Sequence, residues 1–144
     1  PRPVRVLTWS LVAVTAVVVF LGVLVTGSGP HSGDSETEVR FSFDPQAISW
    51  IHADTVFLFL GLLLGLFTTL FLFPSTGPMR KRILLLLGIS LLQGTIGYVQ
   101  YFTGLPEVLV GLHVLGAVLV WIAVLSIPFS MRTRGLATVS ASRT

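Results

Sequence analysis

The sequence has no cysteine and few charged residues. Only 10% of its 144 residues are charged, whereas 53% are hydrophobic. A soluble domain of this size carries about 25% charged residues, so this chain lacks the polar surface that a protein in water exposes. The missing cysteines exclude disulfides, thiolate metal sites and a cysteine nucleophile. The composition therefore predicts a single membrane domain over residues 1–144.

The excess of basic residues is also small. Nine Lys and Arg residues stand against six Asp and Glu residues, so an isoelectric point near 10.2 reflects a small difference between two small numbers. Nucleic-acid binding requires a dense basic patch on one face of a protein. We therefore expect no nucleic-acid partner, and the positions of the charges carry more information than their sum.

Four apolar stretches are long enough to cross a bilayer, whose hydrocarbon core of about 30 Å needs about 20 helical residues. They cover residues 6–26, 48–73, 83–101 and 108–129, and Asp54 is the one charged residue within them. Glycine and proline residues separate the stretches, as is typical of turns between helices. The sequence predicts an all-α, integral membrane four-helix bundle that has the lipid bilayer as a partner.

The basic residues indicate how the chain is oriented. Eight of the nine fall on one side of a chain that crosses four times, and Arg40 is the exception. Loops rich in Lys and Arg remain in the cytoplasm. We therefore predict a multi-pass cell-membrane protein with both termini in the cytoplasm.

Three ionisable residues lie inside the predicted spans, namely His52, Asp54 and His113. Such residues are costly in a membrane and are functional candidates for that reason. Both histidines come soon after the start of a span, and both of these spans start on the same side of the membrane. At a rise of about 1.5 Å per residue, the two imidazoles lie at similar depth. Two imidazoles at one depth on two helices can bind one metal ion between them.

The donor set favours haem b over other metal centres. Apart from Asp54, the spans offer no carboxylate or thiolate that would complete a zinc or di-iron site. A porphyrin supplies four ligands of its own and leaves two axial positions for imidazoles. We predict that His52 and His113 are the axial ligands of a haem b iron. The alternative is that each histidine only forms a hydrogen bond across a helix interface.

Small residues accompany the histidines. Gly116 follows His113 by three residues, on the same helix face, and the third span carries Gly94 and Gly97. Small residues commonly allow transmembrane helices to approach closely, which is the simplest interpretation of these glycines. A flat macrocycle requires the same close approach. Gly94, Gly97 and Gly116 are therefore candidate haem-contacting residues.

Other polar residues of the spans have less specific interpretations. Asp54 lies about 200° around the helix from His52, so we expect it to be solvated near the membrane surface or to contact a partner. Gln93 and Gln100 are expected to form hydrogen bonds between helices.

Two residues of the long loop after the first span are also considered. Arg40 is the basic residue on the unexpected side, and its guanidinium group matches a carboxylate such as a haem propionate. Arg40 is therefore a candidate cofactor-binding residue. His31 is expected to be a solvated loop histidine.

Longer segments resemble a known family. Residues 93–106 read QGTIGYVQYFTGLP, and residues 112–117 read LHVLGA. Together they resemble the carboxy-terminal half of haem A synthases of the actinobacterial type. Residues 24–34 and 51–54 resemble the same half, so that the likeness extends over all four spans in order.

This resemblance implies an eight-helix, pseudo-symmetric bacterial membrane protein, of which the chain would be one half. Haem A synthases oxidise the C8 methyl group of haem O to the formyl group of haem A, which is needed for cytochrome oxidase assembly. Their carboxy-terminal half holds a low-spin haem b between two histidines, which correspond to His52 and His113. The substrate haem and an essential glutamate belong to the amino-terminal half, so Glu107 does not take that role and the catalytic residue is unknown.

Several possibilities remain open from the sequence. The chain is a fragment of a longer synthase, or it is a separate subunit that pairs with a partner or with itself. Haem O would be reached through the amino-terminal half, and haem O synthase is a candidate partner. One alternative is a stand-alone bis-histidine cytochrome b that carries electrons, and another is a non-redox protein whose histidines only pack.

Overall fold

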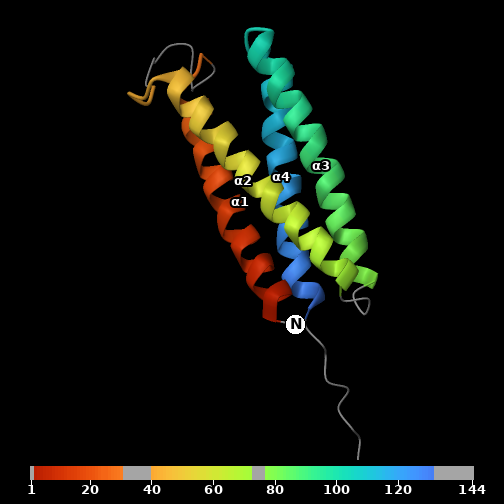
Figure 1. Cartoon of the computed structure of the whole chain (residues 1–144). Coiled ribbons are helices and arrows are strands. Elements are labelled where there is room, and N and C mark those ends of the chain that lie inside the picture. Colours follow the sequence, from red (N-terminus) through yellow and green to blue (C-terminus); the bar gives the residue numbers. More distant parts are fainter. Residues whose placement is uncertain (1, 31–39, 73–76, 132–144) are drawn as a thin grey trace, which may run out of the picture.

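Four long helices form an antiparallel bundle (Figure 1). The computed structural model describes residues 2–30, 40–72 and 77–131. The helices are α1 (Arg2–Ser28), α2 (Pro45–Leu72), α3 (Gly77–Phe102) and α4 (Glu107–Ser130). All four are long and apolar enough to cross a membrane, and the predicted spans fall within them as far as the described residues reach. The predicted all-α four-helix membrane bundle is confirmed.

Local sequence explains where α2 begins. Asp44 precedes the helix, and its Oδ2 accepts a hydrogen bond of 2.8 Å from the backbone N–H of Ala47. Pro45 occupies the first helical position, where its missing N–H is no loss and its fixed φ suits the helix. An acidic cap also interacts favourably with the positive end of the helix dipole.

The turn between α3 and α4 depends on Gly104. This residue has φ +79°, a left-handed conformation that glycine adopts without steric cost. The backbone N–H of Leu105 then donates to the carbonyl of Gln100 over 2.8 Å, which closes α3 in a Schellman motif. Pro106 and Glu107 follow at once and start α4. The short turn therefore keeps α3 and α4 adjacent.

The arrangement of the four helices places α2 and α4 on one diagonal. Each helix packs against the next along the chain, and α1 also packs against α4, whereas α2 and α4 do not pack together within the described residues. We call the end with Arg2 and Arg80 the basic end, and the end with Asp44 and Glu107 the acidic end. At the acidic end the α1–α2 pair diverges from the α3–α4 pair (Figure 1).

The hydrophobic core lies toward the basic end. Its largest fully buried side chains include Leu11, Leu66, Leu86 and Ile127, which come from all four helices. Toward the acidic end, residues 16–27, 49–58, 91–102 and 107–115 include no buried residue. At this end the buried residues of the described chain are Ser28, Gly29 and Ile48, so the large core side chains are concentrated in the other half.

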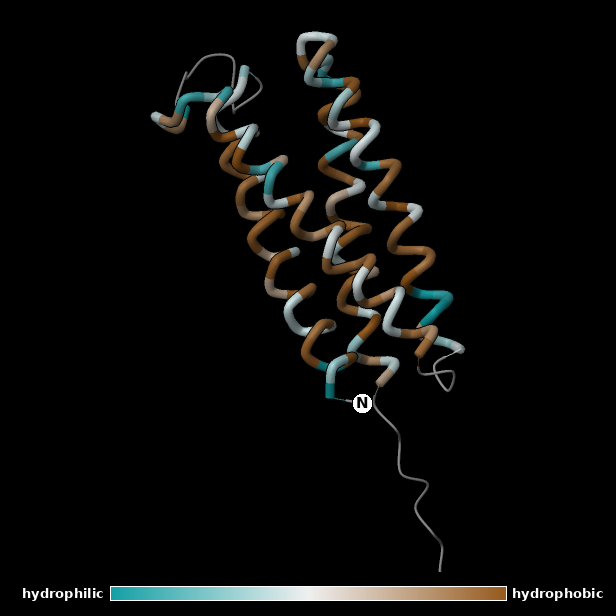
Figure 2. The backbone as a smooth tube through the Cα atoms, viewed as in Figure 1, coloured by the Kyte–Doolittle hydropathy of each residue, from teal (hydrophilic) through white to brown (hydrophobic). Residues whose placement is uncertain are grey.

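The outside of the bundle is as apolar as its inside (Figure 2). Large side chains such as Phe20, Phe57 and Leu115 are more than half exposed. An exterior of this kind needs hydrocarbon around it, because a helix that is hydrophobic all round is stable only when buried or in a membrane. The polar residues gather near the two ends of the bundle (Figure 2).

Candidate functional site

His52 lies near the start of α2 and turns toward α1. Its Nδ1 is 3.1 Å from the backbone oxygen of Val18. Because a carbonyl oxygen can only accept, Nδ1 carries the proton, and Nε2 of the neutral ring keeps its lone pair. The ring lies beside Gly22, where an added Cβ would be 3.4 Å from the histidine Cε1. Gly22 thus leaves room for the imidazole on α1.

His113 is held in a related way on α4. Its ring lies beside Gly97 of α3, where an added Cβ would be 3.2 Å from Cε1 and 3.9 Å from Nε2. The backbone of Gln93 interacts with the ring. Nδ1 of His113 is buried, and its contact with this backbone lacks the full geometry of a hydrogen bond.

The two histidines therefore occupy equivalent positions in two similar hairpins. On α1 the contacting residues are Val18 and Gly22, and on α3 they are Gln93 and Gly97, four residues apart in each case. Each imidazole thus rests on a glycine of the helix before its own and faces a backbone carbonyl one turn earlier. The pairing of each histidine with a glycine is the basic geometry of the site.

The two histidines lie across the bundle from each other. The residues come from α2 and α4, the two helices that lie on one diagonal and do not pack together. A group held between these rings would therefore lie inside the bundle, toward its acidic end.

The protein offers two nitrogen ligands at this site. The zinc and di-iron sites considered above need three or more protein ligands. An iron that carries four porphyrin ligands needs only the two imidazoles.

The three glycines predicted to contact haem have different surroundings. Gly97 contacts His113, and Gly116 is buried beneath the side-chain amide of Gln93. A Cβ on Gly94 would meet nothing within 4 Å, so this glycine faces open space on α3. Of the three glycines, Gly97 is the one that contacts a predicted ligand.

Three polar residues predicted from the sequence lie away from the rings or outside the description. Arg40 is exposed in the chain leading to α2 and interacts with other residues of the protein. The next residue, Phe41, donates its backbone N–H to Gly27 over 2.9 Å, which ties this segment to the end of α1. Asp54 is exposed on α2, as expected, and His31 lies outside the described residues.

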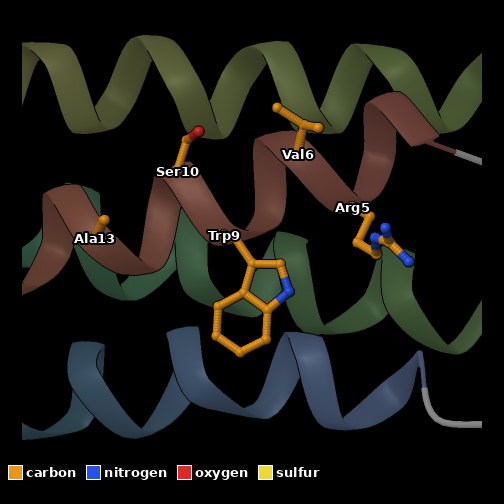
Figure 3. A pocket seen from close by; sticks show the side chains of 5 residues that line it. All are labelled: Arg5, Val6, Trp9, Ser10 and Ala13. Atoms are coloured by element: carbon orange, nitrogen blue, oxygen red, sulfur yellow. The ribbon is translucent and has the colours of Figure 1, made fainter.

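A surface hollow elsewhere in the molecule is unrelated to the histidines. It is formed by residues of α1 near the basic end, which are Arg5, Val6, Trp9, Ser10 and Ala13 (Figure 3). Because His52 and His113 lie toward the acidic end, this open hollow does not belong to their site.

Sequence reasoning missed Val18 and Gly22. The signal that would have found them is the internal similarity of the two hairpins, because matching His52 to His113 also matches Gly22 to Gly97. Gly22 alone did not indicate a contact with His52, because a helix that is apolar all round does not show which of its faces meets α2.

The chain matches no protein-family model, no curated protein and no solved structure. The fold and the site together define a class: an all-α four-helix membrane bundle with a pair of interior histidines on diagonal helices. Any more specific assignment depends on the residues that resemble haem A synthases and on the chemistry of the histidine pair.

Proposed function

We propose that the chain is the haem b-binding, electron-transferring half of a membrane haem A synthase. The observation that carries this proposal is the histidine pair: His52 and His113 come from diagonal helices, and each rests on a glycine of the helix before its own. The resemblance of residues 93–117 to the carboxy-terminal half of such enzymes supports it.

The donor chemistry fits a bis-histidine haem. His52 donates from Nδ1 to a backbone carbonyl, which leaves Nε2 as the ligand atom and fixes the orientation of the ring. The ring of His113 lies beside the backbone of Gln93, the counterpart of Val18 in the other hairpin, so its Nε2 would serve as the ligand atom in the same way. Bound between the two, haem b would supply reversible one-electron transfer between ferrous and ferric iron.

The rest of the chain would position the two imidazoles and keep water away from the haem. Gly22 and Gly97 allow the imidazoles to lie close to α1 and α3, and the incomplete core toward the acidic end leaves apolar side chains to surround a macrocycle. A water-poor, apolar environment also controls the potential at which such a group accepts an electron.

The remaining parts of the proposal follow from the distribution of charges and from the resemblance. The chain would work in a bacterial cell membrane with both termini in the cytoplasm, beside an amino-terminal half that binds haem O and oxidises its C8 methyl group. Haem O synthase is a candidate supplier of that substrate. Arg40 is a candidate partner for a propionate, at the end of the bundle nearer the histidines.

The test is the optical spectrum of the protein purified from cells that produce haem. We expect a low-spin, six-coordinate haem b spectrum that His52→Ala and His113→Ala each remove or convert, since either change deletes an axial ligand. His31→Ala is the matched control and should leave the spectrum intact. Purified protein without haem, or a low-spin spectrum that survives both substitutions, would contradict the proposal.

A further inference from the structure

The hollow near the basic end lies on the outer face of α1. It has a volume of about 430 Å³, and all five residues that line it belong to this helix (Figure 3). The buried residues of α1, which include Val4, Thr8 and Leu11, lie on the opposite face of the helix. In a protein that spans a membrane, the hollow therefore opens toward lipid and not toward the interior of the bundle.

The side chains of this face determine the shape of the hollow. Trp9 is 56% exposed and stands out from the helix, whereas Ser10 and Ala13 are small and leave a depression beside it. Arg5 and Ala13 are eight residues apart, which corresponds to about 12 Å along the helix axis. Because Arg5 directly precedes the predicted span, the hollow extends from the level of the lipid head groups into the hydrocarbon.

Arg5 has no acidic partner at this end of the bundle. Within the described part of the chain it makes no hydrogen bond or ion pair. By contrast, Arg80 lies over the ring of Phe71 at 5.1 Å, and Arg82 donates to the backbone oxygen of Ser126. The six acidic residues of the sequence lie within residues 34–54 or at position 107, and none belongs to the segments at the basic end. The negative charge that balances Arg5 must therefore come from another molecule.

The charges around the hollow favour a ligand with net negative charge. Arg2 precedes Arg5 by three residues on the same side of α1, and the positive end of the helix dipole adds to their charge. A guanidinium group matches the oxygens of a phosphate, to which it donates two hydrogen bonds. The indole N–H of Trp9 is a further donor, and its nitrogen lies on the side of the ring nearer Arg5 (Figure 3).

We propose that the hollow binds one phospholipid with a net anionic head group, from the leaflet at the basic end. Arg5 and the indole N–H of Trp9 bind its phosphate, and one acyl chain runs beside the indole ring over Ser10 and Ala13. Basic residues at a membrane surface attract anionic lipids, and tryptophan is typical of the same level. A free phosphate ion would occupy only the Arg5 end, whereas a lipid also fills the apolar end.

The experiment measures how brominated lipids quench the fluorescence of Trp9. The sequence has three tryptophans, so Trp50→Phe and Trp121→Phe in the full chain leave Trp9 as the reporter. The haem-free protein is reconstituted in phosphatidylcholine bilayers that contain a small fraction of brominated phosphatidylglycerol or, separately, of brominated phosphatidylcholine. We expect the anionic lipid to quench Trp9 at about a five-fold lower fraction, which is the attraction of one basic residue near the surface. Equal quenching by the two lipids would overturn the proposal.

Trp50 is the matched reporter for a tryptophan without such a hollow. It is 60% exposed, close to the 56% of Trp9, but it lies on α2 toward the acidic end. With Trp9→Phe and Trp121→Phe, the two brominated lipids should quench Trp50 equally. The same preference for the anionic lipid at both tryptophans would overturn the proposal. Absence of quenching at Trp9 by either lipid would also overturn it, because protein such as a second copy of the chain would then cover the hollow.

Substitutions test the two ends of the hollow. Arg5→Gln should abolish the preference of Trp9 for the anionic lipid, and Ala13→Phe should reduce it because the new ring fills the apolar end. Arg80→Gln removes a charge from α3 at the same end of the bundle and is the matched control, which should retain the preference. Equal loss in Arg5→Gln and Arg80→Gln would indicate only a general attraction to the surface and would overturn the proposal. Because the protein is free of haem, failure of the haem proposal leaves this result unaffected.

Discussion

The imidazole of His113 lies so close to Gly97 that a side chain there could not be added without movement. A Cβ on Gly97 would be 3.2 Å from Cε1 of the histidine, whereas the corresponding distance between Gly22 and His52 is 3.4 Å. The second distance is ordinary van der Waals contact, but the first is tighter than most real contacts. An added Cβ at Gly97 would therefore disturb His113 more than an added Cβ at Gly22 would disturb His52.

Gly97→Ala is predicted to displace the His113 ring. The ring must move by a few tenths of an ångström, and we expect a cost of about 1 kcal/mol, typical of mild overpacking. Gly94→Ala, one turn earlier on α3, is the matched control because its Cβ meets nothing within 4 Å. Thermal unfolding followed by circular dichroism should show a lower melting temperature for Gly97→Ala alone. Equal melting temperatures for the two variants would contradict the predicted contact.

Arg82 is predicted to stabilise the basic end of the bundle. Its Nη1 donates to the backbone oxygen of Ser126 over 2.6 Å and so joins α3 to α4. Removing this charged hydrogen bond from an exposed position should cost about 1 kcal/mol, at the low end for such bonds because solvent and head groups compete. Lys81→Ala controls for the lost charge. A similar melting temperature for Arg82→Ala and Lys81→Ala would show that the bond contributes nothing measurable.

Asp44 is predicted to contribute as a helix cap. Asp44→Ala removes the acceptor for the Ala47 N–H and should cost about 1 kcal/mol, while Asp44→Ser keeps a capping oxygen and should cost less. Hydrogen exchange at the start of α2 is the direct measurement, since the first turn should open more readily in the alanine variant. Similar exchange in the alanine and serine variants would exclude a capping role.

The fold could be predicted from the sequence because the membrane limits the possible structures. Backbone groups in lipid must be paired within the segment, so an apolar stretch of about 20 residues becomes a helix. The ends were less predictable. α3 begins at Gly77, six residues before the predicted span starts at Ile83, because a helix continues through Arg80–Arg82 while long basic side chains reach toward the membrane surface.

The candidate site could be predicted only in part. The similar depth of His52 and His113 followed from the rise of a helix, which is the same for every sequence. Which glycine contacts which histidine depends on the register between neighbouring helices, and a helix that is apolar all round gives no face from which to infer it. For this reason Gly94 and Gly97 were indistinguishable in the sequence, although only Gly97 lies beside a ring.

Orientation in the membrane can be tested with single cysteines, because the chain has none of its own. Ser42 and Gly77 are both exposed, at opposite ends of the bundle. From the distribution of basic residues we expect Ser42→Cys to react with a membrane-impermeant maleimide from outside intact cells, and Gly77→Cys to react only after lysis. Labelling of both cysteines from outside would contradict the predicted topology, and the cysteine-free parent measures the background.

The last prediction is that residues 1–144 cannot make haem A alone. The four helices contain two interior histidines, and a bis-histidine haem b uses both. Asp54 is exposed, so it is a poor substitute for a buried catalytic carboxylate at a second haem. A homodimer would duplicate the haem b site without creating a different one. Co-expression with the amino-terminal half of a haem A synthase should therefore be required for turnover, and chromatography of extracted haems measures it when haem O is supplied. Haem A formed by the chain alone would overturn the prediction and would assign His52 and His113 to the substrate itself.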